Sequence, residues 1–176
     1  FIDGSAGQVT CHRAWGQSRK WGVWNAYNRQ PLYLQSGDAT ASWEYTTTPI
    51  ATRPSNNAAA NSLTVFSGLP EESYDLRFNH KVMIESEVGT SDMLIETGIG
   101  WNSTSAASGK KGHLFYNNAN VDNLQIGADA IAQFQQVPVL GVNVVTALEA
   151  WSTSVDGDAF FYGTEANMVL SAHWRG

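Results

Sequence analysis

The chain has 176 residues, with 16 Asp and Glu against 10 Lys and Arg, which gives a formal net charge of −6 at pH 7. This acidic balance argues against sequence-independent binding of nucleic acid and against binding to anionic membranes, because both need clustered basic side chains. Cys11 is the only cysteine, so the chain can form neither an internal disulfide nor a cysteine-based zinc site.

The first part of the chain contains short β-like runs separated by turn residues. Turn residues that recur roughly every 8 to 12 positions are typical of β-sandwiches and barrels. The runs are Trp21–Tyr27, Leu32–Gln35, Ala41–Tyr45 and Leu63–Phe66. Pro and Asn residues in the span Thr46–Asn61 predict a surface loop with room for one helical turn.

The middle of the chain contains the two clearest strand patterns. Apolar residues occupy every second position of Tyr74–Ile84 and again of Met93–Trp101. Gly89–Ser91 predicts a turn between these runs, which would make them the central hairpin. His80 lies on the apolar phase of the first run, where we expect a core imidazole bonded to a neighbour. The polar stretch Asn102–Gly112 predicts a loop.

The last third of the chain predicts two further strands and one ambiguous segment. Asp122–Gln136 has a ragged helical spacing, which Gly127 and the nearby Pro138 weaken. Val142–Trp151 is apolar on both faces, as in a central strand or a strand packed between subunits. Met168–Trp174 alternates again, and we expect it to form the final hairpin with the residues before Gly163.

These patterns predict an all-β fold, specifically an antiparallel β-sandwich of jelly-roll-like type. We expect residues 1–20 to connect to an upstream stem and residues 21–176 to form a single domain. The chain begins at Phe1 without a Met, which favours a fragment of a longer protein. It has no run of about 20 apolar residues that would span a bilayer.

The residue patterns predict no catalytic centre, cofactor or metal site. The four histidines are scattered singly, which does not suit a metal site, and there is no Gly-x-Ser-x-Gly nucleophile elbow. The aromatic, Asn, Gln, Ser and Thr residues of the loops suit carbohydrate recognition, in which rings stack on sugar faces and amides bond hydroxyls. The same composition is also ordinary for loops, so both interpretations stay open.

The segment Trp21–Pro31, with the sequence Trp-Gly-Val-Trp-Asn-Ala-Tyr-Asn-Arg-Gln-Pro, resembles the entry segment of tail-fibre and tail-tip proteins of tailed bacteriophages and prophages. Later blocks resemble the same family in the same order: Trp43–Tyr45, Arg53–Asn57, Gly98–Thr104 and Phe161–Gly176. The resemblance implies a homotrimer whose distal β-rich domain meets the host cell surface. It implies no catalytic residue. The low share of charged residues, 15%, also favours a surface partly covered in an oligomer.

We therefore expect a receptor-binding tip domain at the distal end of the virion tail, facing the outside of the host cell during attachment. Its expected partners are bacterial cell-surface polysaccharide or another host receptor, two further copies of itself and the upstream fibre stem. Nucleic acid and membrane insertion are not expected. The candidate ligand-binding residues lie in or beside the polar loops: Trp101, Asn102, Tyr116, Asn56 and Asn57.

Two other functions stay open at this point. A capsule-degrading tailspike domain would cleave the glycan with paired carboxylates, for which Glu85 and Glu96 across the central hairpin are candidates. A purely structural cap would trimerise the fibre and bind no receptor.

Overall fold

The structure is a computed structural model that describes residues 7–13, 19–25, 31–46, 48–58, 60–67, 73–86, 92–117, 123–153 and 157–175. Within these ranges nearly all regular structure is β-strand, and the one helical element is the 3₁₀ turn η1 (Ser55–Asn57). The strands are β1 (Gly7–Arg13), β2 (Arg19–Asn25), β3 (Pro31–Ser36), β4 (Ser42–Tyr45), β5 (Ile50–Pro54), β6 (Ser62–Ser67), β7 (Tyr74–Ser86), β8 (Met93–Trp101), β9 (Ser108–Tyr116), β10 (Leu124–Gln136), β11 (Gly141–Ser152), β12 (Gly157–Tyr162) and β13 (Met168–Arg175). The predicted all-β class is confirmed.

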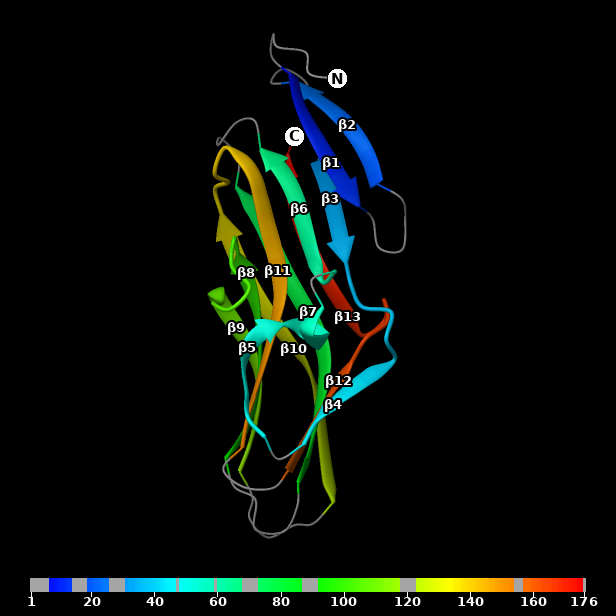
Figure 1. Ribbon diagram of the computed structural model, residues 1–176, viewed down its shortest axis with the longest axis vertical. Coiled ribbons are helices and arrows are strands. Elements are labelled where there is room, and N and C mark those ends of the chain that lie inside the picture. The colour runs from blue at the N-terminus through cyan, green and yellow to red at the C-terminus, as the bar shows by residue number, and fades with distance from the viewer. Residues whose placement is uncertain are drawn as a thin grey trace.

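An 11-stranded antiparallel sheet makes up most of the molecule, and it curls back on itself (Figure 1). Its main path runs β3–β13–β7–β10–β9–β8–β11–β5, with β12 and β4 attached beside β7 and with β6 attached to β11. Strands β9 and β10 share only one paired position, Gln133 with Lys110. The sheet therefore turns between these strands, and the β7 side comes to face β8 and β11.

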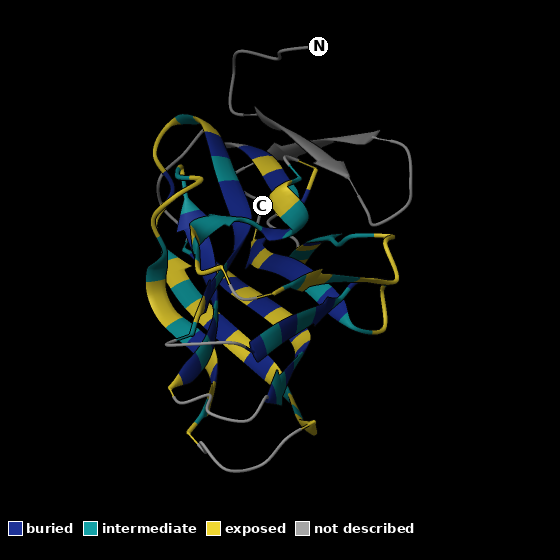
Figure 2. Ribbon diagram, turned by 60° about the horizontal axis from the view of Figure 1, so that its bottom comes forward, coloured by how far each residue is buried: buried dark blue, intermediate teal, exposed yellow. Residues whose placement is uncertain are grey.

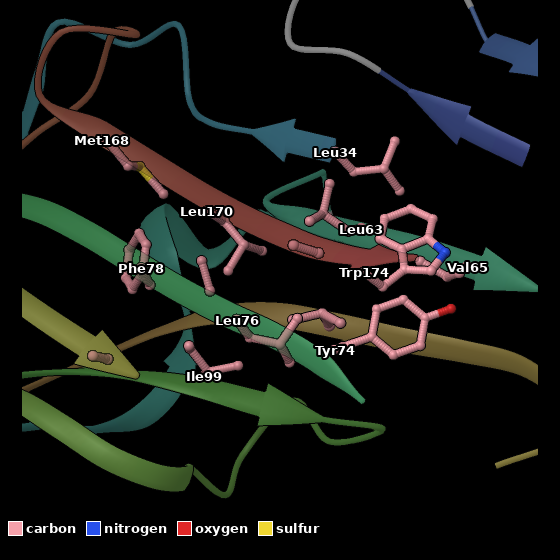
Figure 3. Packing of buried hydrophobic residues seen from close by; sticks show 14 residues of the cluster. Leu34, Leu63, Val65, Tyr74, Leu76, Phe78, Ile99, Met168, Leu170 and Trp174 are labelled. Carbon is pink, nitrogen blue, oxygen red and sulfur yellow. The ribbon is translucent and has the colours of Figure 1, made fainter. Parts of the chain in front are cut away.

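The core fills the space inside the curl and consists of two apolar clusters. The first contains Leu76 and Phe78 of β7 together with Ile99 of β8, and Figure 3 shows its side chains pointing toward one another. The second contains Val82 and Ile84 of β7 together with strands β8, β11 and β12. Both clusters thus join the two halves of the curled sheet, because each half buries its inner face against the other.

The strongest sequence patterns are confirmed as strands. Strand β7 alternates between buried and more exposed residues along its whole length. Figure 2 shows alternation of this kind in the sheet as stripes of dark blue with yellow or teal. The strands expected at Met93–Trp101, Val142–Trp151 and Met168–Trp174 are present as β8, β11 and β13. Strand β11 is central, as expected, because it pairs with β8 on one side and with β5 and β6 on the other.

The predicted central hairpin is wrong, although both of its strands exist. Strand β7 pairs with β10, β12 and β13, whereas β8 pairs with β9 and β11. The two strands lie in opposite halves of the curled sheet, where each covers the apolar face of the other. A hairpin would have left both apolar faces pointing the same way and in need of another cover. The turn expected at Gly89–Ser91 lies outside the described residues.

The predicted final hairpin is also wrong. Strands β12 and β13 both pair with the same edge of β7, β12 along Val82–Ser86 and β13 along Asp75–His80. Between these two stretches the Lys81 amide donates to the Asn167 carbonyl at 2.7 Å. The two strands therefore follow one another along β7 and do not fold back on each other.

Three segments expected to be loops or left ambiguous contain strands. The span Thr46–Asn61 holds β5 and the predicted helical turn η1, and Asn102–Gly112 becomes strand β9 from Ser108 onward. The ragged segment Asp122–Gln136 is strand β10, which pairs with β7 along all 13 of its residues. Pairing with a long neighbour fixes these segments in a way that their own periodicity does not show.

The first two strands form a separate two-stranded sheet, with Gly7 opposite Asn25 and Arg13 opposite Arg19. Strand β1 packs beside β6 and, to a smaller extent, beside β3. Residue 20, where the connecting segment was expected to end, lies within β2.

Close packing at the curl makes Gly112 of β9 sensitive to substitution. A Cβ atom there would lie 2.7 Å from Thr97 Oγ1 and 2.8 Å from the Ala130 carbonyl carbon. We expect Gly112→Ala to lower the free energy of unfolding by about 1–3 kcal/mol, measured by urea unfolding, because the added methyl group overpacks the site. The control is Gly127→Ala on β10, whose Cβ would meet only the Val82 carbonyl oxygen, at 3.5 Å. Equal losses in both variants would contradict this explanation.

Candidate functional site

Asn56 and Asn57, two of the predicted ligand-binding residues, lie in η1 and have left-handed backbone conformations with φ values of 53° and 48°. Asn tolerates this conformation better than most residues. The Asn56 side-chain amide donates to Asp38 Oδ2 at 3.1 Å and to Thr40 Oγ1 at 3.3 Å. Asn61 donates to the same Asp38 oxygen at 2.8 Å, so these amides hold the loop together. Asn57 is exposed.

The backbone of Asn56 contacts Glu149 of β11, whose pKa is shifted furthest among the carboxylates of the described residues. The Asn56 N–H donates to Glu149 Oε1 at 2.9 Å, and the Tyr45 hydroxyl donates to the same atom at 2.5 Å. Trp43 Nε1 lies 3.2 and 3.1 Å from the two carboxylate oxygens. One side chain thereby connects β4 and η1 to the central strand β11.

Burial dominates the electrostatics of this cluster. The Glu149 side chain is buried, which raises its pKa to about 7, even though its three hydrogen-bond donors and the Arg53 charge act to lower the pKa. The Arg53 guanidinium lies 4.6 Å from the centre of the Tyr45 ring. Burial and the neighbouring Glu149 raise the pKa of Tyr45 to about 12. The cluster therefore keeps Tyr45 protonated as a hydrogen-bond donor.

His80 lies on the other side of Trp43, with ring centres 5.4 Å apart. The rings of Phe78 and Phe161 pack against it at 5.1 and 5.4 Å. The expected burial of His80 in the core is confirmed, but neither ring nitrogen makes a hydrogen bond of normal geometry. Burial lowers the pKa of His80 to about 3, although Asp38 and the Tyr162 backbone partly oppose this shift. His80 is therefore neutral at physiological pH.

Glu149, His80 and Thr97 form a polar layer between the two apolar clusters. Thr97 is paired with Glu149 across β8 and β11, and Trp43 packs against both clusters. A sequence signal for this layer exists, because Glu149 is the single charged residue in the mostly apolar strand β11. Because Glu149 is only 1% exposed and its oxygens are bonded within the protein, its geometry supports anchoring of β4 and η1 to β11.

Trp101 and Asn102, the next two candidates, lie together at the end of β8. The half-buried Trp101 ring is 5.9 Å from the ring of Tyr74 in the first apolar cluster. The Asn102 backbone N–H donates to the Val144 carbonyl at 2.7 Å, and Asn102 Oδ1 accepts from the Val144 N–H at 2.7 Å. Its side-chain amide also reaches Asn143 Oδ1 at 3.4 Å. Asn102 thus extends the β8–β11 pairing by mimicking a strand residue.

Tyr116, the last candidate, lies at the far end of the same strand pair. It is paired with Met93, the first residue of β8, whereas Trp101 is the last, and this separation corresponds to about 26 Å of extended chain. The structure therefore brings Trp101 and Asn102 together and Asn56 and Asn57 together, but it places Tyr116 apart from both pairs. Ligand binding by each residue stays a prediction.

The carboxylate pair considered for glycan cleavage is not formed. Glu85 and Glu96 are not opposite each other, because β7 and β8 are unpaired. Glu96 makes an ion pair with Lys111 at 3.0 Å, and Glu85 accepts a hydrogen bond from Gln125 Nε2 at 2.5 Å. Each acid therefore bonds to a neighbouring strand of its own half.

Comparisons with protein-family models, with curated proteins and with solved structures find no match to this chain. Among the described residues, no group of three or more His, Cys, Asp or Glu side chains is arranged to hold a metal ion. Within the same residues no helix has the length and apolar character to cross a membrane.

Glu149 makes the stability of the fold depend on pH. Its folded-state pKa of about 7 exceeds the ordinary value of 4.5, so between these pH values the folded chain binds more protons than the unfolded chain. Its contribution therefore declines as pH rises from 4.5 to 7. We expect the free energy of unfolding of Glu149→Gln, relative to that of wild type, to rise by on the order of 3 kcal/mol from pH 4.5 to pH 7. Urea unfolding at several pH values measures this difference. The control is Glu44→Gln, an exposed acid on β4, and a flat difference for Glu149→Gln would contradict the prediction.

His80 acts in the opposite direction. Its folded-state pKa of about 3 lies below the ordinary value of 6.5, so in this window the unfolded chain binds a proton that the folded chain does not. Wild-type stability therefore falls through this group as pH falls from 6.5 to 3. We expect the unfolding temperature of His80→Leu, relative to that of wild type, to rise as pH falls over the same range, measured by thermal unfolding scans. The exposed His113→Leu on β9 serves as the comparison, and the same pH trend in that variant would argue against the burial mechanism.

Proposed function

We propose that this chain is the receptor-binding domain of a bacteriophage tail fibre or tail tip, which attaches the virion to polysaccharide on the host cell surface. In this proposal the curled sheet is a β-sandwich of jelly-roll-like type, three copies assemble at the distal end of the fibre, and the domain binds its receptor without cleaving it. The resemblance over residues 21–176 and the antiparallel all-β fold support the proposal.

The observation that supports the trimer is an exposed apolar stretch that runs from the end of β10 into the start of β11, which we call the apolar band. Its members are Val137, Val139, Leu140 and Val142, with exposed fractions of 48%, 60%, 60% and 63%. Monomeric proteins seldom expose contiguous apolar surface of this kind, and such a surface is typical of sites where chains associate. These exposed apolar side chains would be covered if further copies of the same chain packed against them.

The position of the band supports this assembly. Val142 pairs with Phe66 near the end of β6, and β1 packs beside β6. The band, the β1–β2 hairpin and the end of β13 therefore lie at the same end of the molecule (Figure 1). Subunit contact at this end, next to an upstream stem, leaves the sides and the opposite end of each domain available to the host. Three linked copies bind a repeating polymer with high avidity even when each single site is weak.

The proposal predicts the mass of a trimer by light scattering at micromolar concentration. Leu140→Asp places a charge in the apolar band, so we expect it to shift the protein toward monomer and to weaken adsorption to host cells by about 100-fold or more. Phe115→Asp is the matched control, because Phe115 is 59% exposed but lies on β9, away from the band. Circular dichroism checks that both variants fold.

Three outcomes would contradict parts of this proposal. A wild-type monomer, or a Leu140→Asp trimer of normal stability, would reject the band as the subunit contact. Release of new reducing ends from host polysaccharide would favour a glycan-cleaving domain. Trimers that fail to adsorb to any host cell would favour a purely structural cap.

A further inference from the structure

The outer face of strands β3, β13, β7 and β10 is broad, exposed and not covered by another described element. Along β7 the residues Asp75, Arg77, Asn79 and Lys81 all point away from the core and are exposed. The neighbouring strands continue this face, because His173 of β13 lies opposite Asp75, and Asp129 of β10 lies opposite Lys81. We call this surface the outer platform.

An aromatic pair stands at the edge of the outer platform. Tyr33 of the edge strand β3 lies opposite His173 of β13, and their ring centres are 4.4 Å apart with the planes inclined by 48°. The Tyr33 side chain remains 48% exposed, so one side of the pair is open to solvent. A large ring held on an open polar surface offers a face on which the apolar side of a sugar ring can stack.

Two hydrogen bonds fix the orientation of this ring. The Tyr33 hydroxyl donates to Gln35 Oε1 at 2.6 Å, and Gln35 Nε2 donates to Glu165 Oε1 at 3.2 Å. Both bonds lie near the protein surface, where side chains would otherwise sample several rotamers. A ring that is already ordered loses less conformational entropy when a ligand binds. The platform therefore has a preorganised contact point.

The charged residues of the outer platform indicate which class of ligand it can bind. Basic Arg77 and Lys81 alternate with acidic Asp75 and Asp129, so no single sign of charge dominates. A polyanion such as nucleic acid needs a surplus of basic side chains. A protein partner is typically bound through an apolar centre with a polar rim. The part of the platform around Tyr33 and His173 is instead lined by polar side chains, and the apolar Val169 and Ile131 flank Asn79 farther along the sheet. An uncharged polymer rich in hydroxyl groups fits the surface best.

We propose that the outer platform binds an uncharged bacterial polysaccharide, with one sugar ring stacked on Tyr33 beside His173. Gln35, Arg77 and Asp75 lie next to this pair and offer donors and acceptors for the hydroxyl groups of the flanking sugars. This inference rests on the proposed function and assigns the receptor contact to residues other than the loop candidates. The site lies on the outer face of the sheet, so each site is expected to be weak and the three sites of a trimer act together.

The test uses the full chain and purified bacterial polysaccharides, both neutral and acidic, immobilised on a biosensor. We expect wild type to bind one or more neutral polysaccharides and Tyr33→Ala to weaken this binding at least about tenfold, because the stacking surface is lost. Tyr33→Phe keeps the ring and is expected to retain most of the binding. His173→Ala is a second variant that tests the same pair from another strand.

Phe115→Ala removes another exposed ring, 59% exposed against 48% for Tyr33, that lies outside the platform, and it is the matched control. Light scattering and thermal unfolding verify that each variant keeps the wild-type assembly and fold. If Tyr33→Ala and His173→Ala both bind polysaccharide as strongly as wild type does, the platform is not the binding site, although the proposed role in host attachment would still stand. Binding restricted to acidic polysaccharides, or to host cells stripped of polysaccharide, would overturn the ligand class. A wild-type chain that binds neither polysaccharide nor host cells would reject the proposed function as well.

Discussion

The hydrogen-bonded carboxylate of Glu149 is the interaction on which the arrangement of the central core depends. It lies between two apolar clusters and receives donors from β4 and η1, segments distant from β11 in the sequence. A buried carboxylate without partners would be strongly destabilising, so these donors must be in place for the core to close. The raised pKa of Glu149 shows that the donors offset only part of the cost of burial. The nearby His80 gains no comparable partner and remains neutral.

The curl of the sheet divides the residues of each strand between two tasks. Inner residues such as Leu76 and Phe78 build the core, while the outer residues of the same strand form an exposed polar face. This division follows from the alternation of side chains along a strand. The apolar band, which runs from the end of β10 into β11, departs from the pattern, because its residues are apolar and exposed. A polar outer platform and an apolar band near the hairpin end suit different partners, namely a polar ligand and another copy of the chain.

Local periodicity predicted strands well and their partners poorly. The alternation in Tyr74–Ile84 is a property of one segment, so it could be recognised without knowledge of the fold. The choice of neighbour for β7 depends on β10, β12 and β13, which are distant in sequence, and the closeness of β7 and β8 along the chain suggested the wrong partner. The prediction of ligand-binding residues was limited for the same reason, because partners distant in sequence could not be foreseen. Polar loop residues such as Asn56 and Asn102 were chosen for their side chains, and the structure shows those side chains bonded within the protein.

The sequence by itself determined the all-β class, the positions of the strongest strands and the burial of His80, because each follows from the period of two and from the apolar phase of a strand. Only the tertiary structure decided that β7 and β8 face each other, that Glu149 collects donors from β4 and η1, and that Tyr33 meets His173 on an exposed face. These features join residues far apart in the chain. Their formation depends on how the curled sheet closes over its core, which no local pattern of residues encodes.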